Sequence, residues 1–190
     1  MKRQNLYITL IALTAVTATV VSCSKSFLEK SPQSSLTTGN FYKTAKDAEG
    51  ALIGAYDALQ QEYYIWDYQI NGDTRSDNTY AGGDNPTNFQ IDKFQVNAIN
   101  SNVERDWNML YNAIMRTNAV LDNVPGITDP AWTTDERKNQ ILGEAKFLRA
   151  LHYFHIVRNW GDVPLLLSMA GADIFKTRSS EARVSAAIEK

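Results

Sequence analysis

Two histidines, His152 and His155, are the residues whose spacing most directly suggests chemistry. They lie three positions apart in EAKFLRALHYFHIVRNWGDVPLLL, residues 144–167. On one helix face they could bind a metal ion, provided that further ligands came from elsewhere. The nearest acids, Glu144 and Asp162, make neither the HExxH nor the ExxH spacing that places a carboxylate beside such a pair. We therefore expect both rings to pack sideways in a helix interface and to donate to a backbone carbonyl or a carboxylate.

The charged residues of the same stretch lead to a similar interpretation. Glu144, Arg149 and Arg158 stand among apolar residues, so any of them that is buried should be paired. The planar fork of Arg149 suits a carboxylate or the carbonyls of a helix end. Nucleophilic catalysis has no support, because the chain contains no GxSxG and no glycine-rich phosphate loop. The sequence predicts a protein that is not an enzyme and has no cofactor, with a histidine-based metal hydrolase as an unfavoured alternative.

A second candidate site lies in the polar segment between Asp67 and Ser101. Turn-forming Asn, Asp, Gly, Ser and Thr dominate it, so we expect one long loop. Such a loop inside a domain is usually either functional or disordered, and we favour a function because its aromatic residues are separated by hydrogen-bonding side chains. Asp73, Asp77 and Asn78 could offer oxygen ligands to Ca²⁺, but their spacing is not that of an EF-hand. Turns and caps formed by these side chains are the preferred interpretation, and no metal site is predicted.

The same loop has the composition of a sugar-binding surface. Pyranose faces stack on aromatic rings, while Asp, Asn and Arg side chains bond to the hydroxyl groups. Trp107 falls on an apolar helical stripe instead, and we expect it in the core. The predicted ligand-binding residues are Trp66, Arg75, Asp77, Asn78, Tyr80 and Phe89.

These sites need a helical scaffold, and the apolar periodicity predicts one. A helix begins at Thr44, where Asp47 completes a capping box, and a second runs from about Asn102 to Val124. A third begins at Thr133 and carries two apolar sides, so it should pack between neighbours. Residues 180–190 begin another helix. The fold class expected is all-α, with stacked antiparallel helices and a long polar loop.

The N-terminus predicts export and a lipid anchor. Lys2 and Arg3 precede an uncharged, mostly apolar run of sixteen residues, 6–21, which leads into Ser22 and the chain's only cysteine, Cys23. This arrangement is typical of a lipobox, in which the signal is cut before the cysteine and the cysteine is acylated. We predict a signal peptide over residues 1–22, a Ser/Thr-rich tether over 23–40 and a helical domain over 41–190.

The charge balance argues against nucleic acid as a partner. Without Lys2 and Arg3 the mature chain has 17 basic and 21 acidic residues, and no basic patch stands out.

Four stretches together resemble the N-terminal half of the SusD/RagB family of Bacteroidetes outer-membrane lipoproteins. They cover most of the mature chain, and the last is the most specific. The stretches are SCSKSFLEKSP, NFYKTAKDAEGALIGAYDAL, Trp107 followed by YNAIMRTNAVLDNVP, and ILGEAKFLRALHYFHIVRNWGDVPLLL.

The resemblance implies a tetratricopeptide-like scaffold, lipid-anchored at the outer membrane and exposed at the cell surface. It also implies an oligosaccharide or peptide ligand and a SusC-like TonB-dependent transporter as partner. Family members are far longer, so we expect the helical domain to be incomplete at its C-terminus. A helical-repeat adaptor that docks other envelope proteins is the alternative, and the polar segment argues against it because an adaptor needs no such insertion.

Overall fold

The computed structural model describes residues 37, 39–132, 134–170 and 176–189, and the chain divides into two units, 1–41 and 42–190. In the first unit the described residues form a turn, in which the backbone N–H groups of Asn40 and Phe41 donate to the carbonyl of Thr37. The predicted signal peptide, Cys23 and most of the tether lie outside the described residues. All the helices below belong to the second unit.

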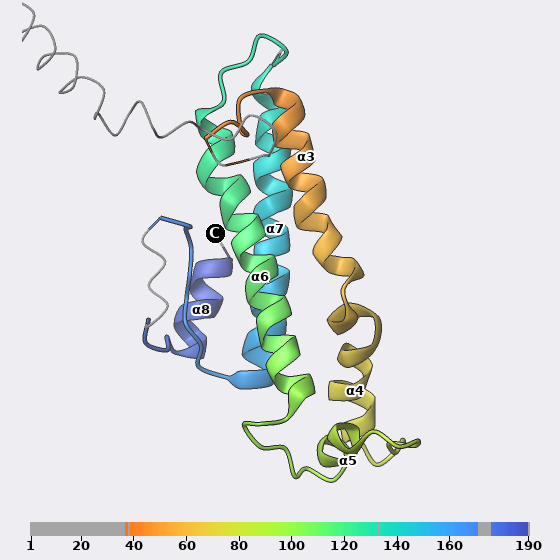
Figure 1. Cartoon of the computed structure of the whole chain (residues 1–190). Helices are drawn as coiled ribbons and strands as arrows, with labels where there is room; N and C mark the ends of the chain where they lie inside the picture. The colour runs from red at the N-terminus through yellow and green to blue at the C-terminus, as the bar shows by residue number, and fades with distance from the viewer. Residues whose placement is uncertain (1–36, 38, 133, 171–175, 190) are drawn as a thin grey trace, which may run out of the picture. The chain divides into compact units, whose positions relative to one another are not determined.

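The second unit is built from helices, as predicted (Figure 1). Its described part contains no strand beyond an isolated antiparallel bridge between Val163 and Ser179. In chain order the elements are α3 Ala45–Tyr56, the 3₁₀ turn η1 Asp57–Gln60, the π-helix η2 Tyr63–Asp67, α4 Tyr68–Gly72, the 3₁₀ turn η3 Asp73–Arg75, α5 Pro86–Asp92, α6 Ser101–Asn123, the 3₁₀ turn η4 Val124–Gly126, α7 Asp135–Trp160 and α8 Glu181–Ile188.

Local sequence signals determine where the helices begin and end. The capping box of Thr44 and Asp47 is confirmed. The backbone N–H of Asp47 donates to the Thr44 hydroxyl, and the backbone N–H of Thr44 donates to the Asp47 carboxylate. The third helix starts slightly later than predicted, because Thr134 rather than Thr133 supplies the cap. Gly161, with a φ of 67°, ends α7 in a conformation that favours glycine.

Three long helices lie side by side, with α6 antiparallel to α3 and α7 (Figure 1). A first apolar cluster joins them near the end of α6 and the start of α7. Its members on each helix lie three or four positions apart and so share one face. This spacing is the apolar periodicity from which the helices were predicted. Its members are Ala48, Leu52, Ala55, Val120, Val124, Ile127, Ile141, Ala145 and Leu148.

A second apolar cluster lies near the other ends of α6 and α7. The extended residues after α7 and the helix α8 close it, so the stretch DVPLLL has a packing role. Its members are Tyr63, Leu110, Ile114, Tyr153, Ile156, Val163, Leu165 and Val184.

As predicted, α7 packs between neighbours, with α3, α6 and α8 against it. Most of its first apolar side is buried, but the second side remains partly open, with Phe147 and Phe154 exposed by 65% and 50%. The guanidinium of Arg158 lies 5.2 Å from the ring centre of Phe154 and partly covers it.

The polar segment is also more ordered than the predicted loop. Short helices η3, α4 and α5 interrupt it, and Asn85 caps α5 with Pro86 at its first turn. Each of these helices has at most two turns, so its apolar residues do not repeat often enough to reveal a helix in the sequence. Among the described residues, no helix has both the length and the hydropathy needed to span a membrane.

The first cluster makes a prediction about two adjacent residues of α7. Leu148→Ala should lower the free energy of unfolding by about 2–5 kcal/mol, because it empties space in the interior. Phe147→Ala, on the open side, should change it by no more than about 0.5 kcal/mol. Urea unfolding followed by circular dichroism measures both, and equal losses would contradict this description of the core.

Candidate functional site

The main candidate site is a cavity of about 540 Å³. It lies where the polar segment meets the first turns of α6 and the last turn of α7. Apolar, aromatic and hydrogen-bonding side chains are mixed around it, as expected of a small-molecule site. The lining residues are Asn71, Arg75, Ile91, Val96, Asn97, Ala98, Val103, Glu104, Asp106, Trp107, Asn159 and Trp160.

Two tryptophans form the aromatic wall of this cavity. The rings of Trp107 and Trp160 meet edge to face, with centroids 5.5 Å apart and an interplanar angle of 78°. Both are half-buried and pack against the second apolar cluster, so the wall rests on the core. Trp107 is thus in the apolar stripe, as predicted, but it also faces the cavity.

Arg75 brings a charged group to the cavity from the polar segment. It is exposed, and its guanidinium lies 5.6 Å from the ring centre of Phe94. Asn97 and Asn159 add amide groups, which can both donate and accept hydrogen bonds.

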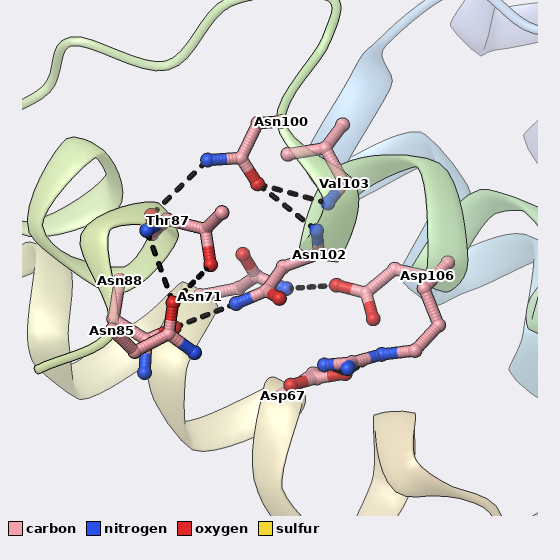
Figure 2. A network of polar contacts seen from close by, with 10 residues as sticks. Asp67, Asn71, Asn85, Thr87, Asn88, Asn100, Asn102, Val103 and Asp106 are labelled. Carbon is pink, nitrogen blue, oxygen red and sulfur yellow. Dashed lines mark hydrogen bonds and ion pairs between the residues drawn. The ribbon is translucent and has the colours of Figure 1, made fainter.

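A network of amide side chains attaches the polar segment to the start of α6 (Figure 2). The Asn100 amide donates to the carbonyl of Thr87 and to the side chain of Gln90, while its oxygen caps α6. Asn102 donates to the Asn88 side chain at 2.6 Å. These bonds hold residues 87–90 against the start of α6. They fix this part of the polar segment although no single helix runs through it.

A buried pair of carboxyl groups continues this network. Asp67 and Asp106 are exposed by 1% and 0%. Arg105 donates from Nε at 3.0 Å and from Nη2 at 2.5 Å to Oδ2 of Asp67. Asn71 donates at 2.7 Å to Oδ2 of Asp106 (Figure 2).

The remaining oxygen of each carboxyl group, Oδ1, has no donor in the described part of the chain. Burial and the neighbouring carboxyl group of Asp67 raise the pKa of Asp106 to about 8.

The two histidines are packing residues, as predicted, although their partners differ from the expected ones. His152 is fully buried, and its Nδ1 is hydrogen-bonded to the Tyr64 hydroxyl at 2.6 Å rather than to a carbonyl or carboxylate. His155 lies edge-on to the rings of Tyr63, Tyr64 and Tyr68. Burial lowers the pKa of both histidines to about 4, so both rings are neutral at pH 7.

Glu144 and Arg149, which are half-buried on α7, are paired, also as expected. Glu144 accepts from Arg137 at 2.9 Å and from the Tyr56 hydroxyl at 3.0 Å. Arg149 binds two carbonyl oxygens, the side-chain oxygen of Asn118 and the backbone oxygen of Leu167, each at 3.0 Å. Within the described residues, no three His, Cys, Asp or Glu side chains are placed to hold a metal ion.

The six residues predicted to bind ligand are not all in this cavity. Arg75 lines it, while the other five lie outside its lining. Trp66, at the end of η2, is 59% exposed, and Tyr80 is 81% exposed. Phe89 belongs to α5, with the ammonium of Lys93 5.9 Å from its ring centre.

Asp77 and Asn78 occupy an exposed turn. It is held by Ser76 and Thr79 donating to the carbonyl of Asp73. The turn interpretation therefore fits, although hydroxyl groups rather than Asp or Asn side chains make these bonds.

Sequence reasoning missed most of the cavity, including Asn71, Asp106 and Trp160. One signal could have found part of it. On α6 the buried positions Asn102 and Asp106 continue the apolar series of Leu110 and Ile114 at helical spacing. Polar residues on a buried stripe must have partners, and those partners are in the polar segment.

Comparison with known proteins identifies relatives along most of the chain. Residues 26–190 match a SusD-like family described as "Starch-binding associating with outer membrane". SusD-like protein P38 of Formosa agariphila is 34% identical over 192 residues, which cover 96% of this chain and 35% of that protein. A SusD-like protein of Bacteroides ovatus is 27% identical and covers 83% of this chain and 28% of its own length. The chain spans about a third of the length of these relatives.

Solved structures have the same helical architecture. A SusD superfamily protein from Bacteroides vulgatus superposes with a TM-score of 0.71 at 23% identity, over 79% of this chain and 33% of that one. A structure described as a laminarin binding SusD-like protein has a TM-score of 0.67 at 25% identity, over 78% of this chain and 32% of its own. The stacked helices are therefore tetratricopeptide-like, as predicted.

The buried histidines make the stability of the chain depend on pH. Their pKa is about 4 in the folded state against 6.5 ordinarily, so unfolding takes up protons in this range. Each histidine should therefore destabilise the fold as pH falls from 6.5 towards 4, by up to about 1.4 kcal/mol per pH unit. Denaturant unfolding at pH 7, 6, 5 and 4 should show a smaller loss in His152→Gln than in the wild type. His155→Gln is the matched variant, and equal slopes in all three proteins would contradict the buried, neutral rings.

Proposed function

This chain belongs to the SusD-like family, and from that premise we propose that it is a non-catalytic, glycan-binding protein of the bacterial envelope. The ligand site proposed is the cavity beside Trp107 and Trp160. The observation that carries the proposal is the combination, in one cavity, of an aromatic wall with amide, carboxyl and guanidinium groups.

The chemistry of a sugar fits this combination. A pyranose has an apolar face that packs on an aromatic ring and hydroxyl groups that need both donors and acceptors. Here the indoles supply the apolar contact, Arg75 donates, and Asn97 and Asn159 can do either. A cavity of about 540 Å³ is large enough for a small ligand or the end of a chain.

Names of relatives support the class of ligand. One solved relative is described as laminarin binding, and others, from Bacteroides fluxus and Bacteroides uniformis, as surface glycan-binding protein A. The family description names starch. An oligosaccharide is therefore the proposed ligand class, with peptide as the alternative.

The proposal extends to the anchor and the transporter. Acylation of Cys23 would hold the chain at the outer membrane, since several acyl chains bind a bilayer far more firmly than one. From the cell surface the protein would deliver its ligand to a SusC-like TonB-dependent transporter. Family membership supports this arrangement, because the family is described as associating with the outer membrane.

Titration calorimetry against amylose, laminarin and other glycans tests the ligand site. Arg75→Ala should weaken binding at least tenfold, because it removes a donor from the cavity wall. Lys93→Ala is the matched control: it is also an exposed cation over a Phe ring of the same segment, but it does not line the cavity. Equal affinities in the two variants would place the site elsewhere, and a folded protein that binds no glycan or peptide would refute the function.

The residues predicted from sequence can be tested in the same assay. Trp66→Ala should leave the affinity unchanged if the cavity is the whole site. A loss as large as that of Arg75→Ala would extend the ligand surface from the cavity to Trp66.

The anchor has its own test. Cys23→Ala should abolish incorporation of labelled palmitate and release the chain from the membrane fraction, whereas Ser24→Ala should do neither. Retention of the label in Cys23→Ala would exclude Cys23 as the acylated residue.

A further inference from the structure

Two buried acids are neighbours at the cavity, and one of them, Asp106, lines it. Asp67 and Asp106 come from η2 and α6, and each has one oxygen, Oδ1, without a donor in the described part of the chain. A buried acceptor without a donor is costly, and two adjacent carboxylates repel each other. Figure 2 shows Asp67 and Asp106 beside the bonds that attach the polar segment to α6.

We propose that Asp67 and Asp106 share one proton, which Asp106 donates to Asp67, and that this proton fastens the cavity wall to α6. A single proton satisfies both free oxygens at once, because it turns a repulsive contact into a charge-assisted O–H···O⁻ bond. The pair then has one negative charge, and the guanidinium of Arg105 on Oδ2 of Asp67 balances it.

The surroundings explain why Asp106 is the member that holds the proton. Two donors of the Arg105 guanidinium reach Asp67, so the positive charge lies against Asp67 and not against Asp106. Asp106 receives only the neutral amide of Asn71, from α4. The other groups near it are Tyr63 of η2, whose pKa burial raises to about 12, and Arg75 and Glu104 on the cavity lining. Glu62 also acts on Arg105, while His155, edge-on to the ring of Tyr63, is neutral at pH 7.

A shared proton makes the wall sensitive to pH. While the segment is attached, the pKa of Asp106 is raised to about 8, and in the open segment it returns towards its ordinary value of 3.8. The attached form therefore holds a proton that the open form releases. Opening should become about tenfold more frequent for each unit of pH between roughly 4 and 8 and should level off above 8. The consequence for ligand binding rests on the proposed function, since it assumes that the glycan needs an ordered wall.

Amide hydrogen exchange of residues 67–100 tests this proposal without any ligand. After correction for the intrinsic exchange rate, protection in the wild-type chain should fall by about tenfold per pH unit between pH 5 and pH 8. Asp106→Asn should remove this dependence and keep the protection high, because its amide N–H replaces the shared proton and its oxygen still accepts from Asn71.

Two further variants make the result specific. Asp67→Asn should also remove the pH dependence, but with lower protection at every pH, since Arg105 loses its carboxylate. Asp84→Asn, an exposed acid of the same segment, should behave as the wild type. Wild-type protection that does not change with pH, or Asp106→Asn protection below wild type at pH 6, would overturn the proposal. The exchange experiment uses no ligand, so its result does not depend on whether the chain binds a glycan. The shared proton and the glycan site can therefore be refuted independently.

Discussion

The pairing of α6 with α7 is the interaction on which the other features depend. The two helices run antiparallel, and both apolar clusters use residues from each of them. The first cluster attaches α3, and the second attaches η2, the extended residues after α7 and α8. The cavity lies at the end of the same pair, where Trp107 of α6 meets Trp160 of α7. The aromatic wall therefore rests on the helix pair that both apolar clusters share.

The polar segment is held in a different way. It has little apolar surface to bury, so hydrogen bonds from Asn71, Asn100 and Asn102 attach it to the start of α6. Hydrogen bonds of this kind contribute only about 1 kcal/mol each, and a partner lost from a buried position costs more than that. Such a network is specific in geometry but modest in total stability, which suits a wall that must meet a ligand.

The long helices are held by apolar packing and the polar segment by hydrogen bonds, and this difference decides which parts of the structure could be predicted from the sequence. Long helices such as α6 and α7 repeat their apolar residues over many turns, so their positions, the Thr44 cap and the packing role of His152 could be predicted. The cavity could not be predicted, because its wall joins residues about 30 to 90 positions apart, such as Asn71, Asp106 and Asn159. The mixture of aromatic and polar residues along the segment is a local sequence pattern, and it does not show which side chains meet in space. Of the six residues predicted from it to bind ligand, only Arg75 lines the cavity.

The π-helix η2 has a consequence for how this protein can vary. A π turn contains about one more residue than an α turn, and single π turns inside α-helices are frequent at functional sites. Within Tyr63–Asp67 the first and last residues are both buried. Removing one residue here would change the wide π turn into an ordinary α turn and would change which side chains of Tyr63–Asp67 face inwards. Insertions and deletions are usually tolerated in polar stretches, but at this position the residue count itself is under constraint.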